Sequence, residues 1–438
     1  MKNKELHQIM NSYLCNRCGT CVGLSKGAIT FYDKDGKYLP KIVKELSNEL
    51  IEKIHYACSG KYFNFPEYRE KFFAETTNFH VYTGSFEKIG IGYALDPFLR
   101  RNGASGGIIT TALIYLLEKG KIDGAVTLRM NPKIPWQNQV FIATTRDEII
   151  ESAQSKYCIS SVNEILPQIA AFNGKLAYVG LPPQVQSIRK LQAINDPIVK
   201  NIEYIFGPFY GNTLHFSSVK SLLRSYGEND YRQITKLYFR HGEWPGNMRV
   251  ELKNGKVVEL KKFHANYLIP FFILKNSLIC TDLTNEFTDL SVGDAWAPIY
   301  EERGKGFSLI IARNSKSLQI INGMRKEGWL AFDEISLNEA ITMHSHGYDL
   351  KKRGAFIRIR ILKFFGQPTP DYGYELKDFP LSRYLMELIV SFLFLVFGTR
   401  FSRWAIGLFS PEFLGRFFEK ARTFWKKSSY KIKRTDLF

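Results

Sequence analysis

Three cysteines lie within seven residues near the start of the chain, as Cys15, Cys18 and Cys21 in a CxxCxxC pattern. Thiolates at a regular spacing of three on one loop can bind three irons of a cubane iron–sulfur cluster. The fourth iron then needs a ligand from elsewhere, and the next cysteine is Cys58. The spacing therefore predicts a 4Fe-4S cluster on these four side chains, and the chemistry of such a site is electron transfer.

A zinc site is the alternative interpretation of these four cysteines. Structural zinc sites normally use two CxxC pairs, so the threefold spacing favours iron and sulfur. A helical pattern from Leu46 to His55 precedes Cys58 and could bring that residue back to the loop. In two-cluster bacterial ferredoxins another cysteine follows the third by four residues. Ser25 occupies that position here, so the sequence predicts one cluster rather than two.

The glycine-rich turn Ser105-Gly106-Gly107 is the second candidate binding element, and it leads into a helix predicted over 108–119. Glycines let the backbone approach a ligand closely, and the free N–H groups at a helix start attract phosphate. A turn that merely starts a helix is an equally good interpretation of the same residues. Both interpretations therefore stay open.

Alternating strands and helices between residues 90 and 225 must position these groups. Apolar strands are predicted over 124–128, 176–180 and 204–211, and a helix over 184–191. This alternation predicts an α/β fold with a mixed or mostly parallel sheet. Ligands of such sheets lie at the carboxyl ends of the strands, so the turn at 181–183 is a candidate pocket wall.

The composition of the 438 residues, with 45% hydrophobic and 23% charged residues, is that of a globular protein with two or three domains. The clustered cysteines favour a reducing compartment and a metal site over a disulfide framework. Residues 1–10 are polar and lack the apolar region of a signal peptide. A cytoplasmic location is therefore expected.

The net charge of +18 indicates an anionic partner, and much of the excess lies in the last forty residues. That region contains an apolar run over 385–397, interrupted by Glu387, and an aromatic and basic helix predicted over 411–425. A membrane crossing needs about 20 apolar residues, so a helix lying in the interface of an anionic membrane, at its inner face, is favoured over a span. Packing on the chain's own domain or on another subunit is an equal alternative. Nucleic acid is not an expected partner, because no nucleic-acid-binding fold accompanies the charge.

The chain resembles the coenzyme F420 hydrogenase/dehydrogenase beta-subunit family over about residues 10–345. The motifs that carry the resemblance are, in order, CxxCGxC, SGGIITTALIYLLEKGKIDGAV, SKY, VGLPPQ, RHGEWPG and DLSVGDAW. The resemblance implies an iron–sulfur flavoprotein oxidoreductase of α/β (mixed α+β) class that binds FAD beside the cluster and acts on coenzyme F420 or another acceptor. The implied divisions are a ferredoxin-like cluster-binding segment (1–80) and the N-terminal and C-terminal parts of the family domain (81–165 and 166–345). A helical amphipathic basic tail (346–438) lies outside the resemblance.

The resemblance also implies roles for residues of the flavin pocket, though no catalytic residue is predicted. Ser105, Gly106 and Gly107 would lie against the flavin or its phosphates. Lys156 of the SKY motif would supply positive charge. Arg240 and Trp244 would line the pocket.

Two cysteines that are common in the family are absent from this chain. The family pattern Gly-x-Pro-Cys-Gln has Pro183 at its cysteine position, and the CxxC that would begin at Cys280 has Leu283 in its second place. An additional cluster that uses those thiols is therefore predicted to be lost. Cys158 and Cys280 are predicted to be ordinary buried cysteines.

Three functional hypotheses remain open at this point. The first is a flavin and iron–sulfur oxidoreductase with ferredoxin or reduced F420 as electron donor; the tail alone suggests a membrane-associated substrate, such as a lipid-linked sugar or polyprenyl intermediate. The second is an electron-delivery subunit that feeds a catalytic partner subunit and has no substrate of its own. The third is a binding protein that has kept the fold and lost its cofactors.

Overall fold

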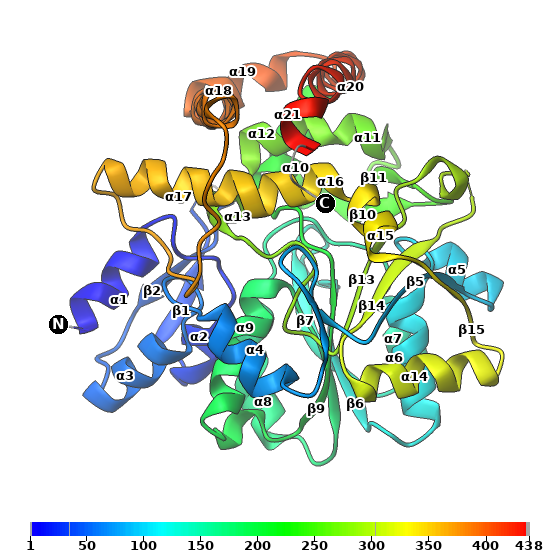
Figure 1. Ribbon diagram of the computed structural model, residues 1–438. Helices are drawn as coiled ribbons and strands as arrows, with labels where there is room; N and C mark the ends of the chain where they lie inside the picture. The colour runs from blue at the N-terminus through cyan, green and yellow to red at the C-terminus, as the bar shows by residue number, and fades with distance from the viewer. Residues whose placement is uncertain (1, 35, 303, 435–438) are drawn as a thin grey trace.

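The computed structural model describes residues 2–34, 36–302 and 304–434 of the chain. Its central feature is an eight-stranded sheet with the order β15-β5-β14-β13-β9-β8-β6-β7 (Figure 1). The strands of this sheet are β5 (Lys88–Ala94), β6 (Gly124–Met130), β7 (Asn138–Ala143), β8 (Leu176–Val179), β9 (Ile202–Pro208), β13 (Leu290–Asp294), β14 (Ser308–Ala312) and β15 (Leu330–Glu334).

Four neighbouring strands form the parallel half of the sheet. β6 pairs in parallel with β8, β8 with β9, and β9 with β13. β14 is antiparallel to both β13 and β5, so β5 runs in the same direction as β13. The carboxyl ends of these parallel strands and of β5 therefore meet at one edge, which we call the carboxyl edge. The predicted α/β fold with a mixed sheet is confirmed.

Both faces of the parallel half are covered, because successive residues of a strand point to opposite sides. Val126 packs in one hydrophobic core with α9 (Pro182–Ala193), whereas its neighbour Ala125 packs in another core with α6 (Ile108–Glu118). Burial on both faces explains why these strands are continuous apolar runs in the sequence. Further helices that pack on these two cores include α5 (Pro97–Asn102), α7 (Arg146–Glu151), α8 (Leu166–Ala171) and α14 (Ser315–Lys326).

The amino-terminal segment lies at one end of the sheet, on the left of Figure 1, and shares the core that contains α9. Leu6 and Ile54 belong to this core. The predicted helix before Cys58 is present, and Ser47 caps its start by accepting a hydrogen bond from the Leu50 amide at 3.2 Å. The elements of this segment are α1 (Lys2–Asn11), α2 (Thr20–Leu24), β1 (Ile29–Tyr32), β2 (Leu39–Ile42), α3 (Asn48–Ala57), α4 (Phe65–Phe73), β3 (Asn78–His80) and β4 (Gly84–Phe86).

A three-stranded antiparallel sheet lies beside the carboxyl edge. Its strands are β10 (Ile234–His241), β11 (Asn247–Leu252) and β12 (Val257–Lys261), and the last two form a hairpin. Leu237 and Val250 pack from it into a separate hydrophobic core. The helices that pack into this core are α10 (Ser217–Ser225), α11 (Lys262–Ala265) and α12 (Ile269–Phe272). α13 (Asn276–Ile279), α15 (Leu337–Met343) and α16 (Ser345–Tyr348) pack into other clusters.

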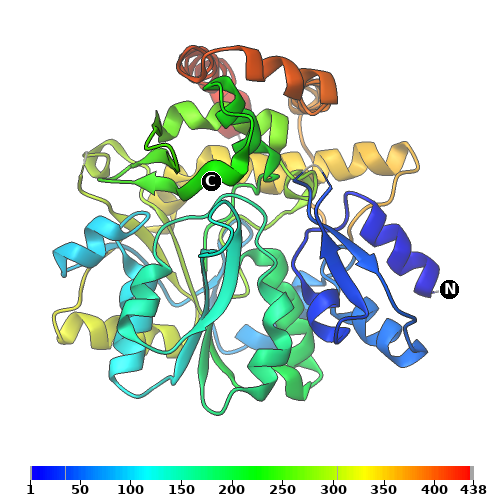
Figure 2. The same cartoon turned by 180° about the vertical axis from the view of Figure 1, so that it is seen from behind.

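The carboxy-terminal helices form an outer layer at one end of the molecule, over α11, α12 and α17 (Figures 1 and 2). Both predicted tail helices are present and are longer than expected. Within the described residues no single helix is long and apolar enough to cross a membrane, and only α18 combined with 400–408, bent by 64°, meets that criterion. α17 (Gly354–Phe364) lies beneath this layer. The helices of the layer are α18 (Leu381–Phe397), α19 (Arg400–Ala405), α20 (Pro411–Ser428) and α21 (Tyr430–Arg434).

Candidate functional site

The four cysteines predicted as cluster ligands come together from two segments of the chain. The first three lie on the loop after α1 and at the start of α2, and Cys58 is the residue that follows α3. Asn16 Nδ2 joins the segments by donating a hydrogen bond to Ser59 Oγ at 2.9 Å. Burial, and then the charge of the other three thiols, raises the pKa of Cys21 well above its usual range. The four side chains therefore form one group, which we call the cysteine group.

Close packing fixes the two cysteine segments in place. A Cβ on Gly19 would come within 2.7 Å of the Ser161 carbonyl oxygen, and the backbone there has a φ of 91° that favours glycine. A Cβ on Gly60 would lie 2.6 Å from the Leu14 carbonyl oxygen. Because Leu14 and Gly60 flank the two cysteine segments, this contact holds the segments against each other.

The donor chemistry of the cysteine group is that of an iron–sulfur cluster, which takes four thiolates. Among residues 2–34, 36–302 and 304–434, no group of three or more His, Cys, Asp or Glu side chains is placed to hold a single metal ion. Tetrahedral zinc requires four sulfurs at about 2.3 Å from one point. The four thiols match the ligand set of a 4Fe-4S cluster, and the threefold spacing of the first three favours a cluster over zinc.

Two buried cations face the backbone of the cysteine group. Lys190 Nζ donates hydrogen bonds to the carbonyl oxygens of Cys58 at 3.0 Å and Tyr62 at 2.8 Å. Burial lowers the pKa of Lys190 to about 8, so the ammonium is mostly charged at neutral pH. Arg17 Nη1 donates to the Cys15 carbonyl oxygen at 3.2 Å. Positive charge at this position stabilises an assembly of thiolates.

Pro183, which occupies the position of the missing family cysteine, lies beside the second cysteine segment. Ser59 Oγ donates to its carbonyl oxygen at 2.6 Å, and Ser187 Oγ at 3.3 Å. The position is therefore next to the cysteine group, but its proline side chain offers no ligand atom. Cys158 and Cys280 are buried, with 1% and 3% of their surface exposed, as predicted.

The glycine-rich turn lies at the carboxyl edge, against β5 and β14. The Gly106 amide donates to Ser308 Oγ at 2.8 Å, and Ser105 Oγ lies 2.7 Å from the same oxygen. A Cβ on Gly106 would meet the Gly92 carbonyl oxygen at 2.5 Å, and Gly107 caps α6 with a φ of 77°. The packing of the turn on its own chain thus already requires the glycines. The same packing places the amino end of α6 at the edge where ligands of α/β folds lie.

β13 ends on Asp294, whose carboxylate joins two of the predicted pocket residues. Arg240 Nη2 lies 3.2 Å from Asp294 Oδ1, and Trp244 Nε1 donates to that oxygen at 2.9 Å. Burial opposes ionisation of Asp294, but Arg240 and Lys262 outweigh it and lower the pKa of Asp294 to about 2. Asp294 belongs to the DLSVGDAW motif but was not predicted as a site residue. Its position at the end of a strand was the sequence feature that could have indicated its role in holding Arg240 and Trp244.

The glycine-rich turn and the Asp294 group (Asp294, Arg240 and Trp244) lie at the same position along the strands. Asp294 pairs with Ser308, and Ser308 pairs in turn with Gly92, the residue on which Gly106 packs. The strand positions that the turn touches lie one and two strand spacings from Asp294, which amounts to about 5 and 10 Å. Five of the six predicted flavin-pocket residues therefore lie along one short stretch of the carboxyl edge.

Lys156 is the predicted pocket residue that points elsewhere. Its Nζ donates hydrogen bonds to the carbonyl oxygens of Ser152 at 2.6 Å, Ala153 at 2.7 Å and Gln154 at 3.3 Å. These acceptors follow α7, so the ammonium is engaged by the end of that helix. Its predicted charge role towards a cofactor remains a prediction.

Arg100 is a further candidate, and no local sequence pattern marks it. Its Nε donates to the Gly306 carbonyl oxygen at 3.1 Å, and its guanidinium carbon lies 3.6 Å from the centre of the Tyr93 ring. Its Nη2 is buried and has no hydrogen-bond partner among the residues that the structure describes. Because a Cβ on Gly306 would touch the Ser105 carbonyl oxygen, this nitrogen lies close to the glycine-rich turn. An unpartnered guanidinium N–H is suited to an anionic group.

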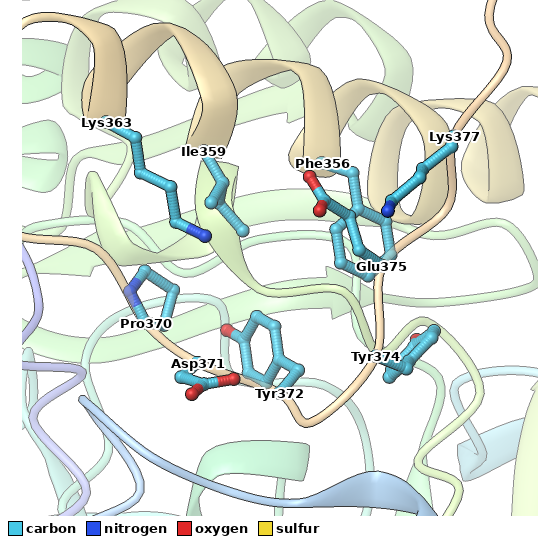
Figure 3. Close-up of a pocket in the computed structure, with 9 residues that line it drawn as sticks. All are labelled: Phe356, Ile359, Lys363, Pro370, Asp371, Tyr372, Tyr374, Glu375 and Lys377. Carbon is cyan, nitrogen blue, oxygen red and sulfur yellow. The ribbon is translucent and has the colours of Figure 1, made fainter.

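Two cavities lie away from the predicted pocket residues. The first, of about 300 Å³, lies between α17 and the segment 370–377; in Figure 3, Lys363 and Tyr372 face each other across it. The second, of about 270 Å³, is lined by Phe65, Phe287 and the buried ion pair of Glu286 with Lys352. Neither cavity is lined by a residue of the cysteine group or of the predicted flavin pocket.

Two family models match the chain, and both describe the beta subunit of coenzyme F420 hydrogenase/dehydrogenase. The model of the N-terminal part of that subunit matches residues 91–167, and the model of its C-terminal part matches residues 173–337. These ranges contain the glycine-rich turn and the Asp294 group. The cysteine group precedes them, and the tail helices follow them.

Curated relatives share about a quarter of their residues with this chain. A coenzyme F420-dependent sulfite reductase of Methanocaldococcus jannaschii is 27% identical over 80% of this chain and 52% of the relative. A coenzyme F420 hydrogenase subunit beta of Methanosarcina barkeri is 26% identical over 50% of this chain and 76% of the relative. The chain thus spans about half the length of the sulfite reductase.

A solved structure of the F420-reducing [NiFe] hydrogenase complex from Methanosarcina barkeri contains a chain with a similar fold. The TM-score is 0.53 at 20% sequence identity, over 67% of this chain and 98% of that chain. At this identity the likeness supports the fold alone.

Proposed function

This chain belongs to the coenzyme F420 hydrogenase/dehydrogenase beta-subunit family, and we propose on that premise that it is an iron–sulfur flavoprotein oxidoreductase. The proposed activity passes electrons between a 4Fe-4S cluster and FAD, for reduction or oxidation of coenzyme F420 or another acceptor. A flavin can exchange electrons in pairs or singly, whereas a cluster exchanges them singly. Together they therefore convert two-electron transfer into one-electron transfer. The observation that carries the proposal is the convergence of the cysteine group from two segments.

In the proposed cluster site, the chain supplies thiolates, positive charge and shielding from water. The proposed ligands are the four members of the cysteine group. Cys18 is 8% exposed, so water reaches this part of the group poorly. Lys190 and Arg17 hold the backbone of both cysteine segments through hydrogen bonds, and their charges favour thiolates over thiols.

In the proposed flavin site, the carboxyl edge supplies the binding groups. The amino end of α6 and the unpartnered Nη2 of Arg100 both favour a phosphate next to the glycine-rich turn. Arg240 and Trp244, held by Asp294, form the proposed far wall. These groups are fixed by the fold before any ligand arrives, which limits the entropy lost on binding.

Anaerobic purification with iron, flavin and visible-spectrum analysis tests this proposal. About four irons per chain, a broad visible absorption and stoichiometric bound flavin are expected. A protein that stays colourless after cluster reconstitution, with no bound flavin, would contradict it and would favour a cofactor-free binding protein.

A second candidate function is that of an electron-delivery subunit in a larger complex. It is favoured because the Methanosarcina barkeri relative is named a subunit of coenzyme F420 hydrogenase. The isolated chain would then carry both cofactors but reduce no substrate of its own. An assay with reduced F420, ferredoxin or NAD(P)H and an artificial acceptor, with and without candidate partner subunits, separates the two functions.

Replacing Lys190 by methionine should lower the midpoint potential of the cluster. The substitution keeps most of the side-chain length and removes a buried positive charge beside Cys58, and this removal favours the oxidised, less negative state of the cluster. We expect a shift of roughly several tens of millivolts to more negative potential, measured by an EPR-monitored redox titration. The exposed Lys200→Met variant is the control and should leave the potential unchanged. Equal midpoints in the wild type and Lys190→Met would argue against a cluster at this position.

A further inference from the structure

α18 buries its charged side chains and exposes its apolar ones. Arg383 and Glu387 are each 1% exposed. A helix on a surface that faces water has the opposite arrangement, with charges outside and leucines inside. The exposed apolar side chains of α18 are Leu381 (74%), Leu385 (54%), Leu388 (48%), Ile389 (52%), Phe392 (62%), Leu393 (40%), Leu395 (62%) and Val396 (38%).

A buried network of ion pairs fixes this inverted orientation. Arg383 binds Asp349 through two hydrogen bonds, at 2.9 and 3.1 Å, and lies 2.7 Å from Glu387. Glu387 also accepts a hydrogen bond from Arg358 of α17 at 2.5 Å. Breaking a buried ion pair leaves an unpaired charge in the interior, which costs stability. α18 is therefore unable to turn its apolar face inward at low cost.

α19 and α20 extend the apolar surface. Sixteen of the twenty-eight exposed large apolar side chains in the described part of the chain lie between residues 381 and 430. We call residues 381–428 the tail platform; Figures 1 and 2 show its helices together as the outermost layer. The most exposed members outside α18 are Phe401 (73%), Trp404 (51%), Leu408 (62%), Phe409 (51%), Phe413 (57%), Phe417 (57%) and Phe424 (72%).

The tail platform is held firmly to the body of the protein. The ring of Phe271 lies 5.0 Å from that of Phe397 and 5.7 Å from that of Phe418. Tyr226 donates a hydrogen bond to Glu412 Oε1 at 2.5 Å. These contacts tie both long helices to the core beneath them, so the exposed apolar face is a fixed feature of the fold.

Basic residues surround the apolar face. Residues 381–434 contain eleven lysines and arginines and three glutamates. Glu387 is buried, and Glu419 lies 3.2 Å from His264, so the acidic groups are already engaged. Exposed cations beside aromatic side chains are typical of helices that lie in the interface of an anionic bilayer. The exposed basic residues are Arg400, Arg416, Lys420, Arg422, Lys427 and Lys431.

We propose that the tail platform lies in the interface of an anionic lipid bilayer, with α18 and α20 in the plane of the membrane. Charge complementarity favours lipid over a protein partner, because anionic headgroups match a broad basic surface without specific pairing. The buried network under α18 favours an in-plane helix over a crossing one, because crossing would pull Arg383 and Glu387 away from their partners. The attachment does not depend on the cofactors of the proposed function, so its test is independent of theirs.

Flotation of the purified full-length protein with lipid vesicles tests this attachment. The protein should float with vesicles that contain phosphatidylglycerol and stay at the bottom with vesicles of phosphatidylcholine alone at high salt. Leu388→Gln/Phe392→Gln should reduce the bound fraction at least about tenfold, because each change removes apolar surface from the bilayer. Lys420→Gln and Lys427→Gln should each weaken binding to anionic vesicles about fivefold.

A matched control is Phe98→Gln/Ile194→Gln, which removes two side chains that are 56% and 50% exposed and lie outside the platform. This variant should float like the wild type. Failure of the wild type to float with anionic vesicles would overturn the proposal, and so would equal flotation of Leu388→Gln/Phe392→Gln. A dimer that this variant abolishes, without flotation, would assign the face to a second copy of the chain. Resistance of the membrane-bound protein to alkaline extraction would show a crossing instead.

Discussion

Replacing Cys18 by serine should reduce the iron content and the visible absorption of the reconstituted protein to near background. Cys18 is the most buried cysteine of the cysteine group, and its Sγ lies 3.1 Å from Thr20 Oγ1 and 3.9 Å from Ser187 Oγ. The shorter, less acidic serine can keep the contact with Thr20, so the loop should fold, but it replaces a thiolate ligand with a poor one. The cluster would be left with three sulfur ligands and should be lost under chelator challenge.

The control for this experiment is Cys280→Ser. Cys280 is also buried, at 3% exposure, but it lies outside the cysteine group. Both variants carry the same chemical change, so a general effect of removing a buried thiol would appear in each. Iron should be lost in Cys18→Ser and kept in Cys280→Ser. Unchanged iron in Cys18→Ser would end the assignment of the ligands.

Local sequence patterns predicted the elements that position the site. The helix before Cys58, the helix after Gly107 and the strand at 176–179 all appear close to their predicted bounds. Each of these is encoded by apolar periodicity, caps and glycines within about ten residues. The sequence therefore carried enough information for the α/β framework and for the cysteine loop.

Contacts between segments that are distant in the chain were not predicted from the sequence. Lys190 reaches Cys58 across 132 positions, and Arg100 reaches Gly306 across 206. No local pattern marks such pairs, because a lysine or arginine on a helix is usually solvated. Glu387 was an unexplained interruption of an apolar run, and the structure accounts for it through Arg358 and Arg383. The amphipathic rule assigns the polar face to water, and α18 reverses that rule.

Replacing Asp294 by asparagine should destabilise the protein and deplete its flavin while leaving its iron in place. The change removes the counter-charge of Arg240, which is 3% exposed and would remain as an unpaired buried cation. Loss of one partner from a buried pair costs about 3–5 kcal/mol. Urea unfolding at neutral pH measures that cost, and flavin and iron analyses report the two sites separately. The exposed carboxylate of Asp333 supplies the control, because Asp333→Asn should change stability by less than about 0.5 kcal/mol.

The pH dependence of stability provides a second, independent signature of the same carboxylate. Arg240 and Lys262 outweigh burial and lower the pKa of Asp294 to about 2, below the ordinary value of 3.8. A carboxyl group with a lowered pKa in the folded state contributes stability that is present above pH 4 and is lost as the pH falls through 2. The wild type should lose about 2 kcal/mol over this window through Asp294. Asp294→Asn should lack that step, and an identical acid profile in both proteins would mean that Arg240 does not depend on this carboxylate. If Asp294→Asn loses flavin but the wild type shows no loss of stability through Asp294 at low pH, the carboxylate would act in the flavin pocket and not in folding. Flavin content reports the pocket contacts of Asp294, and acid stability reports its pairing with Arg240.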